Sequence, residues 1–127
     1  MKILVIEDNA TNALILKRLA AKVCDAEVVV ESDANQALQL CHSQPFDLLI
    51  VDQILPGMTG VQITKAVRQL DSYASVPVVM VTADTDPRLR PEALAAGVTD
   101  FLTKPVEALA FRELLQSHLT SQLSKAS

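Results

Sequence analysis

Short apolar runs alternate with longer amphipathic segments along the whole chain. The short runs are rich in aliphatic residues and end at polar or turn-forming residues, which predicts buried β-strands. The predicted strands cover residues 2–6, 27–31, 48–51, 78–81 and 100–102. Between them, apolar residues recur at the spacing typical of helices. The predicted helices cover about residues 10–23, 34–42, 60–70, a shorter segment that ends at Gly97, and 107–123.

This alternation predicts an α/β fold, in which helices cover both faces of a doubly wound, five-stranded parallel sheet. We expect the flavodoxin-like strand order 2-1-3-4-5. In that order the first and third strands are neighbours, and ligands bind beyond the carboxyl ends of such strands. Asn9 or Thr11 is expected to cap the first helix, and Ser32 or Asp33 the second. Gly97 is a natural left-handed cap.

Composition and charge exclude several classes of protein. Half of the residues are hydrophobic but only 3% are aromatic, so the core must be aliphatic. The net charge of -4 and the scattered Lys and Arg residues argue against direct nucleic-acid binding. No apolar run approaches the roughly 18 residues that span a bilayer, and no signal-peptide pattern precedes the first strand. We therefore expect a cytoplasmic protein without a membrane contact.

Polar residues follow the predicted strands nearest the centre of the sheet. Glu7 and Asp8 follow the first strand, Asp52 the third, Thr82 the fourth and Lys104 the fifth. Each residue alone is explained by a helix cap, a turn or a solvated charge. Together, three carboxylates and one ammonium would gather a net charge of -2 at one edge. Such acids repel each other unless a cation compensates them, which favours a binding site.

The residue types indicate which cation this site would hold. Oxygen ligands without a nearby His or Cys favour a hard ion, and a few carboxylates with water suit Mg²⁺ better than Ca²⁺. With an added ammonium and hydroxyl, such a site suits a phosphoryl group. An aspartate can act as the nucleophile and form an acyl phosphate.

Four segments in this order resemble the receiver domain of two-component response regulators, the CheY-like superfamily. They are residues 5–9, 51–60, 81–83 and 101–105, with the sequences VIEDN, VDQILPGMTG, VTA and FLTKP. The resemblance covers residues 1 to about 120, which we assign to one receiver domain. Residues 121–127 are interpreted as a tail or the start of a linker.

The resemblance implies a phosphorylation site at Asp52. The donor would be a phosphohistidine on a sensor histidine kinase or a phosphotransfer protein. Asp8, Asp52 and the backbone carbonyl of Ile54 would bind Mg²⁺ directly, and Glu7 would reach it through water. The domain would be a signalling module that promotes its own phosphorylation and dephosphorylation rather than an enzyme with a separate substrate.

The same resemblance implies how the signal leaves the site. Thr82 and Lys104 would contact the phosphoryl group, and the Lys104-Pro105 bond would be cis. Phe101 matches an aromatic residue that turns inward on activation, although ordinary core packing is an alternative. The helix before Gly97, the strand over 100–102 and the last helix would form the signalling surface, which would contact an output domain or a second copy of the chain.

Several positions depart from the common receiver pattern. Ile54 and Asp84 flank the path of an attacking water in the family, so we expect them to tune dephosphorylation. A carboxylate at position 84 would either orient water or repel an anionic donor. The Gln53 side chain would either bond locally in the groove or be solvated. Pro91 would disturb a helix that began at residue 87, so this helix should be short, irregular or begin near Arg90.

Other functions fit the residues less well. A phosphatase of the haloacid dehalogenase type needs a second Asp where this chain has Ile54. A nucleotide or flavin binder would need a glycine-rich phosphate loop, and the few glycines suit turns and a cap. A pseudo-receiver, an interaction module that no longer takes phosphate, would usually have lost an acid or the lysine. Near the C-terminus, His118 is expected at the surface, and Leu119 and Leu123 in a linker or dimer contact.

Overall fold

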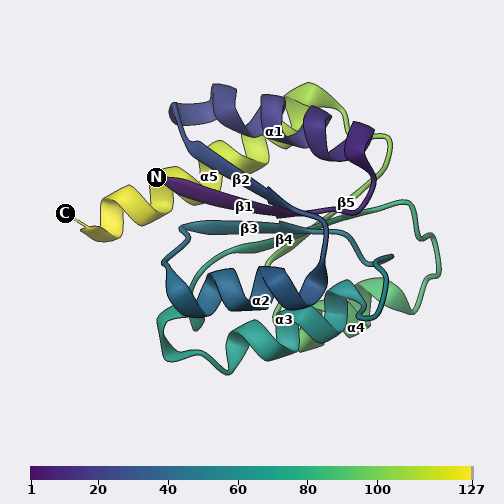
Figure 1. Ribbon diagram of the computed structural model, residues 1–127. Helices are drawn as coiled ribbons and strands as arrows, with labels where there is room; N and C mark the ends of the chain where they lie inside the picture. The colour runs from purple at the N-terminus through teal and green to yellow at the C-terminus, as the bar shows by residue number, and fades with distance from the viewer. Residues whose placement is uncertain (127) are drawn as a thin grey trace.

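Within the described part of the chain, five parallel strands form one sheet in the order β2-β1-β3-β4-β5, as predicted (Figure 1). The computed structural model describes the backbone of residues 1–126 and the side chains of residues 1–23 and 25–118. The strands are β1 (Lys2–Ile6), β2 (Glu27–Glu31), β3 (Leu48–Val51), β4 (Val78–Thr82) and β5 (Asp100–Thr103). The helices are α1 (Ala10–Cys24), α2 (Ala34–Ser43), α3 (Gly60–Arg68), η1 (Asp71–Tyr73), α4 (Leu89–Ala96) and α5 (Ala108–Ala126).

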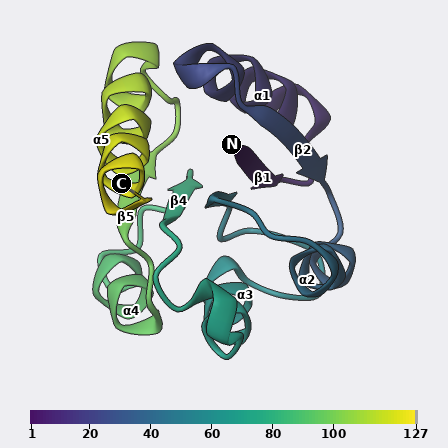
Figure 2. The same ribbon diagram turned by 90° about the vertical axis from the view of Figure 1, so that its left-hand side faces the viewer.

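The helices cover the sheet in two layers. α1 and α5 lie on one face, and α2, α3 and α4 lie on the other (Figures 1 and 2). Because β1, β3 and β4 are covered on both sides, nearly every residue along them is apolar and buried. Their side chains alternate between two hydrophobic clusters, one under each layer of helices. Because these strands are buried in aliphatic clusters, the residues that follow their carboxyl ends are held in fixed positions.

Capping residues define where most helices begin and end. The Asn9 side chain accepts a hydrogen bond from the Asn12 amide at 3.0 Å, and Asp33 does the same for Gln36, so one of each predicted pair is the cap. Gly97 ends α4 with a φ of 112°, as predicted. α3 ends at Arg68, two residues earlier than expected, because the chain tightens there into i→i-3 hydrogen bonds.

α4 is short and starts without a side-chain cap. It begins at Leu89, close to the expected start near Arg90, and no regular helix extends from residue 87. Pro91 is the third residue of the helix. It is tolerated because the first N–H groups of a helix have no partner within the helix. The prediction of a short, late-starting helix is therefore confirmed.

Arg68 ties the end of α3 to the end of α4. Its guanidinium donates hydrogen bonds to the carbonyl of Gly97 at 2.7 Å and to those of Tyr73 and Val76, each at 2.6 Å. A Cβ on Gly97 would lie 2.9 Å from the Arg68 side chain, so glycine is needed for this approach as well as for its backbone angle. One side chain thus joins α3, η1, the start of β4 and the α4 cap.

α5 runs farther than expected, from Ala108 to Ala126. His118 on this helix pairs with Asp100 on β5, a partner that lies 18 residues away in sequence. The side chains of Leu119 and Leu123, assigned to a linker or dimer contact, lie outside the described residues. Among the described residues, none of the helices is both long and apolar enough to cross a membrane.

Candidate phosphoryl-acceptor site

The sheet register brings the carboxyl ends of β1 and β3 to the same level. Ile6 on β1 is the partner of Val51 on β3, so Glu7 and Asp52 follow directly from a matched pair. The hydrogen bonds between β1 and β3 continue one residue further, because the Asp52 amide donates to the Ile6 carbonyl at 3.1 Å. The acids meet because the strand order makes these two strands neighbours.

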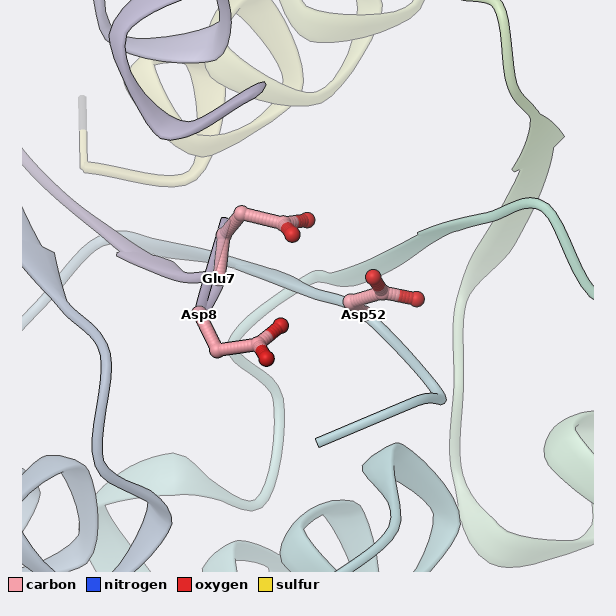
Figure 3. A group of neighbouring side chains, drawn as sticks. All are labelled: Glu7, Asp8 and Asp52. Atoms are coloured by element: carbon pink, nitrogen blue, oxygen red, sulfur yellow. The ribbon is translucent and has the colours of Figure 1, made fainter. Parts of the chain in front are cut away.

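The three predicted carboxylates share a small volume at this edge. Glu7, Asp8 and Asp52 each offer one oxygen, and these oxygens lie within 4.8 Å of one another. Figure 3 shows the three side chains projecting to the same side of the strand ends. Glu7 is 2% exposed and Asp52 is 6% exposed, whereas Asp8 is open to solvent. The cluster therefore has a buried side and an open side.

Lys104 provides the positive charge inside this cluster. Its Nζ lies 2.7 Å from Glu7 Oε2 and 2.9 Å from Asp52 Oδ2. Its backbone amide donates to the Thr82 carbonyl at 2.9 Å, which places the loop after β5 beside the end of β4. The Lys104-Pro105 peptide bond is cis, as predicted. A single ammonium thus bridges acids from two different strands.

Burial and hydrogen bonding shift the pKa values of the two buried acids in opposite directions. Burial raises the pKa of Glu7, and the neighbouring Asp52 charge adds to this, while Lys104 offsets only part of the rise. Burial also acts to raise the pKa of Asp52, but hydrogen bonds from Lys104, Thr82 and the Ile54 amide outweigh it and lower that pKa. Of the two buried acids, Asp52 is therefore the one that is held more firmly in its charged form.

The loop after Asp52 folds back over it. The Ile54 amide donates to Asp52 Oδ1 at 3.2 Å, while the Ile54 side chain is 58% exposed. Gln53 bonds locally, since its Oε1 accepts from the Val61 amide at 2.9 Å. Of the two alternatives left open by the sequence, local bonding is the one observed. Gly57 turns the loop with a φ of 82°.

Thr82 and Asp84 form the other side of the opening. Thr82 is fully buried, and its Oγ1 accepts from the Asp84 amide at 3.2 Å. The Asp84 carboxylate in turn accepts from the Asp86 amide at 2.9 Å. Asp84 and Gln53 also line a groove of about 330 Å³, together with Asp86, Arg88, Leu89 and Glu92. Of the two proposed tuning positions, Asp84 thus bonds to Thr82 and lines this groove, and Ile54 directs its amide at Asp52.

Phe101 lies between the core and the surface. Its ring packs on the cluster beneath α2, α3 and α4 but is only partly buried. The guanidinium carbon of Arg90 lies 6.0 Å from the ring centroid. Sequence reasoning missed this contact, as it missed the pairing of His118 with Asp100, because both join residues on different elements.

The donor set fits Mg²⁺. It consists of carboxylate oxygens, two of them buried, and Lys104 compensates only one of the three negative charges. A hard divalent cation prefers oxygen ligands of this kind and accepts water on its open side. The open position of Asp8 leaves room for such waters.

The chain matches a family model and is similar to several known proteins. The family model described as "Response regulator receiver domain" matches residues 3–116. The chemotaxis protein CheY of Pseudomonas aeruginosa is 35% identical over 116 residues, which cover 91% of this chain and 94% of that protein. The sensor histidine kinase TmoS of Ectopseudomonas mendocina is 30% identical over 123 residues, which cover 97% of this chain but 12% of the kinase.

A solved structure shows the same likeness. The receiver domain of a sensor histidine kinase from Pseudomonas aeruginosa, with a magnesium ion coordinated in its active-site cleft, is 27% identical and superposes with a TM-score of 0.84. The match covers 94% of this chain and 97% of that domain.

Proposed function

Because this chain belongs to the receiver-domain family of response regulators, we propose that Asp52 is its phosphoryl acceptor. One observation carries the proposal: Lys104 lies within ion-pair distance of both Glu7 and Asp52 at the ends of neighbouring strands. This places a charged nucleophile, two further acids and an ammonium in the volume that a phosphoryl group would occupy. The donor is a phosphohistidine on a sensor histidine kinase or a phosphotransfer protein.

Each residue of the site has its own role in phosphoryl transfer. A carboxylate oxygen of Asp52 forms the bond to phosphorus as the bond between phosphorus and the donor imidazole breaks. The lowered pKa of Asp52 keeps this oxygen charged and available. Lys104 then exchanges its carboxylate contact for a phosphoryl oxygen, and the Thr82 hydroxyl donates to another. In this way the domain promotes its own phosphorylation without acting on a separate substrate.

The cofactor of the proposal is Mg²⁺. Asp8, Asp52 and the carbonyl of Ile54 would hold it directly, and Glu7 would hold it through water. When bound, the ion would supply positive charge that screens the phosphoryl oxygens. The buried Glu7 carboxylate, whose pKa is raised by burial, would be stabilised in its charged form by that ion.

The signal leaves through the surface formed by α4, β5 and α5. Movement of Thr82 toward the phosphoryl group vacates space into which the Phe101 ring turns, away from Arg90. An output domain or a second copy of the chain reads this change. The proposal includes a cytoplasmic location, a receiver domain over residues 1–120 and a tail or linker over residues 121–127.

A direct test asks whether the purified protein takes up a phosphoryl group. Incubation with acetyl phosphate and Mg²⁺ should add the mass of one phosphoryl group, and beryllofluoride should shift the amide spectrum. Asp52→Asn should abolish both effects. Asp71→Asn is the matched control, because it removes an exposed carboxylate outside the acid cluster, and it should keep the adduct. An unmodified wild-type protein in both assays would support the pseudo-receiver alternative and overturn the proposal.

Residues 54 and 84 tune how long the phosphoryl group stays on Asp52. Ile54 follows Asp52 by two residues and is exposed, and the Asp84 amide bonds to Thr82 beside the site. Replacing Ile54 by Asn adds a group that can orient water, and replacing Asp84 by Ala removes a charge from the rim. We expect the half-life of the phosphorylated protein to change severalfold in at least one variant. Unchanged half-lives in both variants would show that these positions have no tuning role.

A further inference from the structure

Gln53 forms two hydrogen bonds with the first turn of α3. Its backbone carbonyl accepts from the Gly60 amide at 3.1 Å, and its side-chain Oε1 accepts from the Val61 amide at 2.9 Å. The first two N–H groups of the helix are thus satisfied by the residue that directly follows the acceptor. The remaining open N–H, that of Gln62, bonds to Thr59.

The side-chain bond is not required for α3 to form its cap. Thr59 and Gln62 already make a reciprocal capping box at the start of the helix. The N–H of the second residue has no partner within a helix. Val61 is 3% exposed, and its amide finds its partner in the Gln53 side chain. The bond thus also joins the residue after Asp52 to α3.

The start of α3 rests directly on the acceptor's peptide. A Cβ at Gly60 would lie 2.5 Å from the Asp52 carbonyl oxygen and 3.0 Å from Gln53 Cα. This contact and the two Gln53 bonds close the loop from residue 53 to residue 60. Ile54 lies inside that loop, and its amide is already directed at the Asp52 carboxylate. The Gln53-Ile54 peptide, which carries this amide, is therefore held by the Gln53 bonds, and the Ile54 carbonyl follows it in the same closed loop.

We infer that Gln53 is a positioning residue for the cation site: by bonding to the Val61 amide it holds the loop that carries Ile54, whose carbonyl would be a ligand of the cation. The inference rests on the proposed function, because it assigns this role toward the same Mg²⁺. The inference assigns a role to a residue that would itself contact neither the metal nor the phosphoryl group. Outer residues that orient ligands commonly change metal affinity about tenfold or more when they are replaced.

The test is a Mg²⁺ titration of the purified, unphosphorylated protein, followed by amide NMR signals. Gln53→Met keeps the length of the side chain but removes the oxygen that accepts from Val61. We expect it to weaken Mg²⁺ binding about tenfold. Hydrogen exchange at the Val61 amide should also become faster, since the bond that protects this amide is lost.

Thr59→Ala is the matched control. It removes the capping box from the same helix but leaves both Gln53 bonds intact. It should lower the melting temperature yet leave Mg²⁺ affinity unchanged. An equal loss of Mg²⁺ affinity in both variants would mean that Gln53 acts only through helix stability, and unchanged affinity in Gln53→Met would overturn the inference directly. If the wild-type protein bound no Mg²⁺, the metal site of the proposed function would fail, and this inference with it.

Discussion

α3 and α4 lie next to each other under the same face of the sheet, but they are held in different ways (Figure 2). The start of α3 is bonded by Thr59 and by Gln53, and its first residue presses on the acceptor's peptide. The start of α4 has no side-chain cap, and Arg88 precedes it in an exposed loop. The C-terminal end of α4 is bonded to α3 through Arg68, whereas its start is held by the buried side chain of Leu89 without a side-chain cap.

The two helices would meet two different requirements of the proposed phosphorylation switch. The loop that carries the proposed acceptor must keep its geometry in every state, and the adjoining helix is hydrogen-bonded at both ends. The helix on the proposed signalling surface must be able to respond, and its start is held by the packing of Leu89 without a side-chain cap. A helix held more weakly at one end can shift there when nearby residues move.

The largest expected effect comes from removing the anchor that the two helices share. Arg68→Met leaves the carbonyls of Gly97, Tyr73 and Val76 without their donor, and we expect a loss of about 3 kcal/mol in the free energy of unfolding. Chemical denaturation at neutral pH measures this loss. Arg88→Met is the control at the loose end of α4: its side chain is 87% exposed, so no measurable change is expected. Equal effects of the two substitutions would contradict the contrast between the ends of α4.

A smaller effect is expected where α3 meets the acceptor. Gly60→Ala places a methyl group against the Asp52 carbonyl and should lower stability by about 2 kcal/mol. It should also slow phosphorylation by acetyl phosphate, because the loop must shift. Gly57→Ala in the same loop meets no atom within 4 Å, so only its positive φ is strained, at about 1 kcal/mol. Phosphorylation of Gly60→Ala at the wild-type rate would show that the acceptor does not depend on this contact.

The smallest expected effect concerns Tyr73, beyond the end of α3. Its hydroxyl donates to the Gln44 carbonyl at 2.7 Å and accepts from the Phe46 amide at 3.1 Å. Tyr73→Phe removes both bonds and should cost about 1 kcal/mol at neutral pH.

The loss from Tyr73→Phe should also depend on pH. Burial raises the pKa of Tyr73 from 10.0 to about 12. The folded state therefore keeps the phenolic proton more tightly than the unfolded state, and this contribution is lost as the pH rises from about 10 toward 12. The difference between wild type and Tyr73→Phe should shrink over that range in urea unfolding curves. A constant difference from pH 8 to pH 11 would contradict this assignment of the proton.

The sequence predicts the fold and the main site closely because both depend on local patterns. Aliphatic runs and helical spacing predict the strands, and the strand order alone brings Glu7 and Asp52 together. Contacts between side chains on different elements carry no such pattern. The Arg68 network was therefore not anticipated, and neither was the pairing of His118 with Asp100. For Gln53, both alternatives remained open because the amide that it binds lies on the next helix.

The position of Lys104 has a consequence for how the domain rests between signals. Its ammonium already neutralises part of the charge on Glu7 and Asp52, so the resting protein carries its own counter-ion. In the proposed function, activation would be an exchange of counter-ions, in which Lys104 gives up a carboxylate as it gains a phosphoryl oxygen. Because these pairs are buried, monovalent salt screens them weakly. The response should thus follow the supply of divalent cation and phosphoryl donor, and depend little on the ionic strength around the protein.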